Sequence, residues 1–161
     1  MDSLRILALL SVLTVPGQAV ADYNFEIAKA FAGAYSTDKQ LGDQMQRNVR
    51  SREPIPEYSV IECKQGQRFG VGYVIVFSNT APANFEVVWE YPHLSEVEGD
   101  SREVHQITHR RPRKNAYDFD AEVRVLKKKH LIDGDFVVTL RRDEKILLRH
   151  VFHIRGCDVP A

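Results

Sequence analysis

Apolar residues recur at every second position along most of the chain beyond residue 22, which is the period of a β-strand with one buried face. The clearest run is RFGVGYVIVF, in which the odd positions from Phe69 to Phe77 are apolar. Other segments alternate in the same way. Their apolar positions, which we expect to face one core, are Phe25, Ile27, Phe31 and Tyr35; Phe85, Val87, Trp89 and Tyr91; Tyr117, Phe119, Ala121, Val123 and Val125; Phe136, Val138 and Leu140; and Ile146, Leu148, Phe152 and Ile154.

Short polar connections separate these segments. The charged stretch 141–145 predicts a hairpin turn, and Asp133-Gly134 and residues 78–84 are further turn signals. With one more strand near 58–64, the chain has about seven strands, whereas the best helical candidate, residues 37–49, is weak. The pattern predicts an all-β fold, an antiparallel immunoglobulin-like β-sandwich.

The first 21 residues, MDSLRILALLSVLTVPGQAVA, have the anatomy of a secretory signal peptide. An apolar run from Ile6 to Val15 follows a weakly positive start, and small residues precede Asp22. The run is too short to cross a bilayer, which takes about 20 apolar residues. We therefore expect cleavage before Asp22, a single β-sandwich domain over 22–161, a periplasmic or secreted location and no membrane anchor.

Charge and cysteine content narrow the picture further. The chain has 22 basic and 22 acidic residues, so it has no overall attraction for nucleic acid or for an anionic membrane, and an anionic partner must be held by a local patch. In an oxidising compartment, Cys63 and Cys157 are expected to form a disulfide. The alternative, free or metal-binding thiols, is disfavoured because the two lie far apart and no CxxC motif is present.

The stretch VHQITHRRPRKNAYDF, residues 104–119, carries the candidate binding residues His105, His109, Arg110, Arg111, Arg113 and Lys114. It lies in a long gap between two predicted strands, and gaps beyond about 12–15 residues are often functional or disordered. An acidic block, 96–103, precedes the cationic one. The stretch could be a solvated loop with self-compensating charge, a hairpin extension built on SREVHQITH, or a patch for an anionic ligand or an envelope protein.

Neither a metal site nor a catalytic motif emerges. His105 and His109 stand four apart, but zinc needs three or four ligands and the other histidines have no evident reason to converge. No serine lies in a Gly-x-Ser-x-Gly elbow, and no cysteine–histidine signature is present. The sequence predicts no cofactor, no metal and no catalytic residue, although acid–base pairs assembled from distant loops stay open.

Three motifs resemble the domain-of-unknown-function 3859 family of bacterial proteins: GQRFGVGYVIV, VVWEYP and DGDFVVTLRRDEKILLRHVFHI, in this order. The resemblance covers roughly residues 55–154. It implies a small secreted β-sandwich with no assigned activity, and it carries over no catalytic residue. The chain departs from the family pattern at Phe136, where tryptophan is frequent, and in its unusually charged segment 93–115.

We therefore expect an exported, non-catalytic binding or accessory β-sandwich module whose partner is unknown. The alternatives are an envelope enzyme with a loop-built active site and a polyanion-binding protein that uses the 105–114 segment. We expect no nucleic-acid partner.

Overall fold

The computed structural model describes residues 24–35, 43, 57–92, 101–127 and 131–157. The predicted signal peptide and, apart from residue 43, the weak helical candidate 37–49 lie outside the described residues. In the described part, the strands are β1 (Phe25–Tyr35), β2 (Tyr58–Glu62), β3 (Arg68–Phe77), β4 (Ala83–Glu90), β5 (Arg102–His109), β6 (Tyr117–Val125), β7 (Gly134–Arg142) and β8 (Lys145–Arg155). The strand that the sequence left open is β5. It lies within SREVHQITH, as the hairpin-extension alternative suggested, but it pairs with β4 and not with the cationic block.

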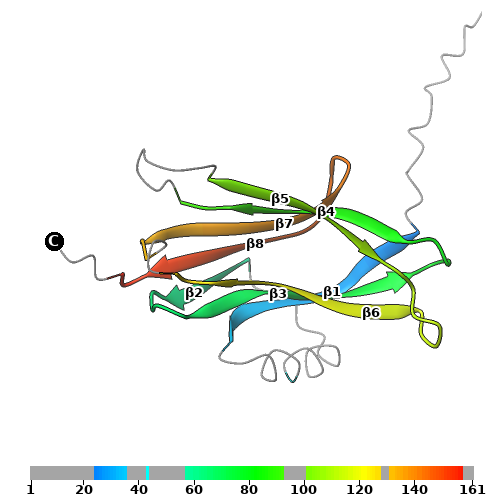
Figure 1. Ribbon diagram of the computed structural model, residues 1–161, viewed down its shortest axis with the longest axis horizontal. Coiled ribbons are helices and arrows are strands. Elements are labelled where there is room, and N and C mark those ends of the chain that lie inside the picture. The colour runs from blue at the N-terminus through cyan, green and yellow to red at the C-terminus, as the bar shows by residue number, and fades with distance from the viewer. Residues whose placement is uncertain (1–23, 36–42, 44–56, 93–100, 128–130, 158–161) are drawn as a thin grey trace, which may run out of the picture.

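The strands form two sheets that pack face to face (Figure 1). One has three strands in the order β1-β3-β6, and the other has five in the order β2-β8-β7-β4-β5. All pairs are antiparallel except β2 with β8, which is parallel. The predicted all-β sandwich is thus confirmed, with eight described strands instead of about seven and one parallel pair.

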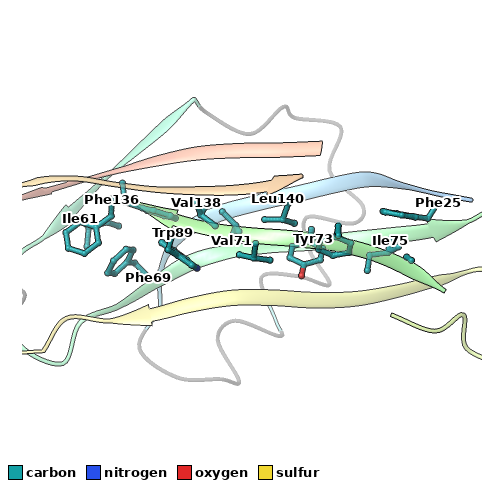
Figure 2. Packing of buried hydrophobic residues seen from close by; sticks show 14 of the residues in the cluster. Phe25, Ile61, Phe69, Val71, Tyr73, Ile75, Trp89, Phe136, Val138 and Leu140 are labelled. Atoms are coloured by element: carbon teal, nitrogen blue, oxygen red, sulfur yellow. The ribbon is translucent and has the colours of Figure 1, made fainter. Parts of the chain in front are cut away.

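The core lies between the two sheets (Figure 2). On β3 the odd positions from Phe69 to Phe77 are all buried, as the alternation predicted. Phe69 is central, because its ring contacts those of Trp89, Phe136 and Phe152 edge-on, at centroid distances of 6.1, 5.5 and 5.0 Å. Aromatic side chains from three strands of the large sheet therefore converge on one ring of the small sheet.

On β1 the expectation of a single buried face is wrong, because the strand contains a register shift between Ile27 and Lys29. Before the shift, Phe25 and Ile27 pair with the inward residues of β3 and face the core. After it, Phe31 pairs with Gly72 on the outer face. One extra residue in a strand reverses the side of every later side chain, so Phe31 and Tyr35 lie on the outer face of the small sheet.

On β6 the expected face is also wrong. The inward residues Val71 and Tyr73 of β3 pair with Glu122 and Asp120, so the charged even positions of β6 face the interior. The apolar odd positions face outward; they are Tyr117, Phe119, Ala121, Val123 and Val125. The physical reason is that β6 is an edge strand whose inner face meets β5, and β5 supplies polar partners in place of an apolar core.

Cys63 and Cys157 form the expected disulfide, with Cα atoms 4.8 Å apart and a sequence separation of 94 residues. Each cysteine directly follows the strand pair β2–β8, just beyond Glu62 and Arg155. The bridge therefore closes the end of the parallel pair. No helix among the described residues has the length and apolar character needed to span a membrane.

Candidate functional site

Polar side chains from β5 and β6 meet along one side of the sandwich, where each strand is the edge of its sheet. His105 and His109 pair with the core residues Val87 and Ala83 of β4, so both histidines face inward. Because β6 also turns its charged positions inward, the two sets meet. We call this row the seam, and it consists of Glu103, His105 and His109 of β5 with Asp118, Asp120, Glu122 and Arg124 of β6.

His109 closes the seam at the end nearest the β5–β6 connection. Its Nε2 lies 2.9 Å from Oδ2 of Asp120, and its Nδ1 lies 3.8 Å from Oδ2 of Asp118. The imidazole stacks on the ring of Phe85 at 5.6 Å and 16°. Only 11% of the side chain is exposed. An aromatic surface and two carboxylates from the opposite sheet therefore hold the ring in place.

Asp120 is the main acidic partner in this contact. Burial raises the pKa of its carboxyl, but the bonds from His109 and from the backbone N–H of Ala121 outweigh burial and lower that pKa below its usual range. The Tyr73 hydroxyl also donates to Asp120 over 3.4 Å. Burial, followed by the charges of Asp120 and Glu122, raises the pKa of Tyr73 far above that of a free tyrosine. Tyr73 therefore remains a neutral donor.

The other end of the seam is organised by Arg124. Its Nη2 lies 2.9 Å from Glu103, its Nε donates to the Tyr91 hydroxyl over 3.2 Å, and its guanidinium carbon lies 4.8 Å from the centre of the Trp89 ring. The Tyr91 hydroxyl in turn donates to Glu103 over 2.7 Å, and this bond is the main cause that lowers the pKa of Glu103. Between the two ends, Nε2 of His105 lies 3.3 Å from the buried carboxylate of Glu122.

The charged groups of the seam contact one another. Each described carboxylate and imidazole of the row contacts an opposite or complementary group of the other sheet, which is the arrangement that makes buried charge tolerable. Inward-pointing charges also protect an edge strand against pairing with other chains. Within the described residues, no three histidine, cysteine or acidic side chains are grouped so that they could hold a metal ion.

The remaining candidates lie outside the seam, in the connection 110–116 between β5 and β6 (Figure 1). Arg110, Arg111, Arg113 and Lys114 are all exposed. Arg111 donates to the backbone carbonyl of Asn115 over 3.4 Å, and none of the four makes an ion pair with another described residue. The structure thus divides the six candidates into two inward histidines and four outward cations, which we call the cationic loop.

Sequence reasoning missed the seam residues of β6. The signal was present in YDFDAEVRV, where four charged residues occupy every second position, in an order that complements Glu103, His105 and His109 read in the opposite direction. Alternation alone does not say which set faces inward. A second edge strand with matching polar residues would have indicated the answer.

A shallow hollow lies elsewhere, on the outer face of the large sheet, where Glu86, Gln106 and Arg141 contribute to its lining. Arg141 Nε lies 2.7 Å from one oxygen of Glu86, and the Gln106 amide donates to the other over 2.7 Å. The polar groups at its centre are therefore engaged with one another.

Comparison with known proteins supports the fold but no function. No family model matches the chain, and no curated protein matches it. Among solved structures, an immunoglobulin-like protein from Pseudomonas aeruginosa has a TM-score of 0.54 at 14% identity, over 84% of this chain and 99% of that one. An alkylpurine DNA glycosylase from Pseudomonas fluorescens, AlkC, bound to DNA with an abasic site analogue, has a TM-score of 0.46 at 14% identity, over 83% of this chain and 31% of that one. The first likeness, together with the two packed sheets, gives this chain the fold of an immunoglobulin-like β-sandwich.

Proposed function

We propose that the protein is a non-catalytic binding module that recognises an anionic partner through the cationic loop. The observation that carries the proposal is the exposure of four cations within five residues, without an ion pair to another described residue. No acidic residue occurs between 110 and 116. A local cluster of this kind attracts anions even when the net charge of the chain is zero.

The fold favours this role because both ends of the cationic loop are held by contacts to neighbouring strands. His109, directly before Arg110, is held by Asp120, and the backbone N–H of Phe77 donates to the carbonyl of Ala116 over 2.8 Å. A binding loop whose ends are held by a rigid scaffold loses less conformational entropy when it meets its partner.

We further propose that the protein acts outside the cytoplasm, in the periplasm or secreted, after cleavage before Asp22. The Cys63–Cys157 disulfide supports this location, because such bonds persist in oxidising compartments. Sequencing the N-terminus of the protein that accumulates in a cell envelope fraction tests it. A protein that retains Met1 and stays in the cytoplasm contradicts it.

We also propose membership of the domain-of-unknown-function 3859 family. The support is the presence of three motifs in the same order: GQRFGVGYVIV, VVWEYP and DGDFVVTLRRDEKILLRHVFHI. In the structure, the second and third motifs meet, because a Cβ atom added to Gly134 would collide with the ring of Pro92. An alignment of family members in which these two positions vary independently in size would contradict this assignment.

The binding proposal is tested by retention on immobilised heparin and on immobilised polyphosphate, eluted with a salt gradient. We expect wild type to be retained, and to lose affinity steeply with salt because bound counterions are released. The variant with Arg110, Arg111, Arg113 and Lys114 all changed to Gln should elute at or near the starting salt concentration.

The matched control changes four exposed cations elsewhere to Gln: Lys64, Arg102, Lys127 and Arg149. Its net charge equals that of the loop variant, but it should elute close to wild type. If the two variants lose retention equally, net charge and not the cationic loop is responsible, and the proposal fails. It fails also if wild type is not retained on either matrix.

A further inference from the structure

Two exposed aromatic residues begin β6, directly after the cationic loop. Tyr117 is 45% exposed and Phe119 is 39% exposed, and their rings meet edge-on with centroids 5.5 Å apart. They pair with Val76 and Val74 of β3, so both project from the outer face of the small sheet. A half-exposed aromatic pair on a sheet face is an unusual use of large apolar side chains, which mostly bury themselves.

The aromatic pair closely follows the cationic loop in the chain. Only Asn115 and Ala116 separate Lys114 from Tyr117, so their Cα atoms lie within about 11 Å of each other. The intervening acidic side chains of β6, Asp118 and Asp120, point the other way, toward His109. Because side chains alternate along a strand, the carboxylates of Asp118 and Asp120 lie on the opposite face of β6 from the two rings.

The rest of the neighbourhood adds little negative charge. The β3–β4 connection, residues 78–82, contains no acidic residue. On the same outer face, Glu26 of β1 is exposed opposite Val76, with β3 between it and β6. Among the described residues, this end of the small sheet therefore has two exposed aromatic rings next to the four cations of the loop, and on its outer face the carboxylate of Glu26 lies two strands away.

We infer that this surface docks the protein peripherally on an anionic lipid membrane. The inference rests on the proposed function and names the partner of the same loop. A soluble polyanion uses only the cations, whereas a lipid surface offers phosphate groups to the cations and an apolar boundary to the rings. Tyrosine suits this boundary because its ring is apolar and its hydroxyl is polar. Cations near an anionic leaflet each strengthen binding about fivefold.

A second copy of this chain is a poorer occupant of the same surface. Each copy would bring its own four cations to the contact, and like charges brought together across an interface oppose association. Charge complementarity therefore selects the lipid surface.

The test is co-sedimentation with large vesicles of phosphatidylglycerol and phosphatidylcholine in equal parts, compared with phosphatidylcholine alone. Wild type and all variants are purified with the N-terminus that the protein has when it accumulates in the expressing cell. We expect wild type to partition onto the anionic vesicles and not onto the neutral ones. Tyr117→Ser with Phe119→Ser should lower partitioning about tenfold or more, because apolar contact with the bilayer boundary is lost. The loop variant should lower it further.

The matched control is Tyr58→Ser with Val60→Ser, which removes side chains that are 55% and 65% exposed on β2 of the other sheet. It should partition like wild type. The aromatic variant should also keep wild-type retention on heparin. If it keeps its partitioning onto anionic vesicles, the lipid inference is overturned while the polyanion proposal stands. If the variant with Lys64, Arg102, Lys127 and Arg149 changed to Gln loses heparin retention as much as the loop variant does, the proposed function is overturned instead.

Should the double serine variant fail to fold, Phe119→Trp keeps the inference testable. A tryptophan at this position should shift its emission to shorter wavelength when anionic vesicles are added, against the constant background of the fully buried Trp89. An unchanged spectrum overturns the inference. A change in oligomeric state of Phe119→Trp or of the serine variant, with no effect on vesicle binding, assigns the surface to a second copy and overturns it as well.

Discussion

His109 shows how one residue joins the apolar core to the polar seam. One face of its ring stacks on Phe85, and the edge of the ring approaches Tyr73 with centroids 6.4 Å apart. Its nitrogens meet carboxylates that come from the opposite sheet. An imidazole can do both because its ring is flat and carries two nitrogens at its rim. A leucine here would fill the space but would leave Asp120 without its partner.

The depressed pKa of Asp120 predicts an acid-dependent loss of stability. A carboxyl whose pKa is lower in the folded state stabilises that state above its unfolded pKa, and the contribution disappears as pH falls through the folded pKa. Urea unfolding between about pH 6 and pH 3 should therefore show a shallower decline for Asp120→Asn than for wild type. The two curves should differ most at the upper end and converge at the acid end.

The His109→Gln background provides the control for this experiment. Because the bond from His109 is the strongest influence that lowers the pKa of Asp120, Asp120→Asn should change the slope less in that background than in wild type. Equal slopes for wild type and Asp120→Asn would show that the contact contributes nothing to acid sensitivity.

At the scale of the elements, period two was sufficient to place β3, β4 and β7, because each has one apolar face and that face meets the core. On β8 it was right for Leu148, Phe152 and Ile154 but wrong for Ile146, which pairs with Arg141 beyond a register shift and is 57% exposed. It failed where an edge or an irregularity intervened. On β6 the apolar set is Tyr117 and its alternating neighbours, yet the inward set is the charged one, because β5 and not the core lies opposite. On β1 the register shift after Ile27 sends Phe31 outward.

The candidate site was recoverable only in part for the same reason. The sequence identified the cations Arg110 to Lys114, since a cluster of basic residues can be read directly from the sequence. It grouped His105 and His109 with them, because neighbours in the chain were assumed to be neighbours in space. Their partners, Asp120 and Glu122, belong to the other sheet, and a pairing between sheets has no local signature in the sequence.

The outward aromatic residues of β1 predict a role for a glycine of β3. A Cβ atom at Gly72 would collide with the ring of Phe31, which is itself held edge-on against Tyr35. Gly72→Ala should therefore lower the free energy of unfolding by about 1–3 kcal/mol, as overpacking does. In a Phe31→Leu background the same substitution should cost less, because the shorter side chain leaves room. Urea denaturation of the four combinations measures this coupling.

Gly33 is the matched control, because it lies on the same outer face and no atom of another described residue lies within 4 Å of the position of an added Cβ. Gly33→Ala should leave stability unchanged or raise it slightly, since alanine restricts the unfolded chain. A loss as large as that of Gly72→Ala would mean that strand propensity, and not contact with Phe31, sets the cost.

At the scale of the whole molecule, the Cys63–Cys157 disulfide links two positions that are far apart in the sequence. It closes a loop of 94 residues between positions that follow β2 and β8. In the chain-entropy account, a loop of this length contributes about 4–5 kcal/mol. Cys63→Ser with Cys157→Ser should lose most of that amount in urea unfolding, and dithiothreitol should lower the stability of wild type but not of the variant. Equal sensitivity of both proteins to the reductant would contradict this.

The parallel pairing of β2 with β8 governs the order in which the sandwich can be completed. β2 has β8 as its only described neighbour in the sheet, and some ninety residues separate the two along the chain. Contacts between such distant segments form late, because the loop between them must first be closed. A ribosome or a translocation channel that still holds β8 thus withholds the partner of β2. Assembly of this edge therefore waits until β8 has emerged, and formation of the Cys63–Cys157 bond reports that it has occurred.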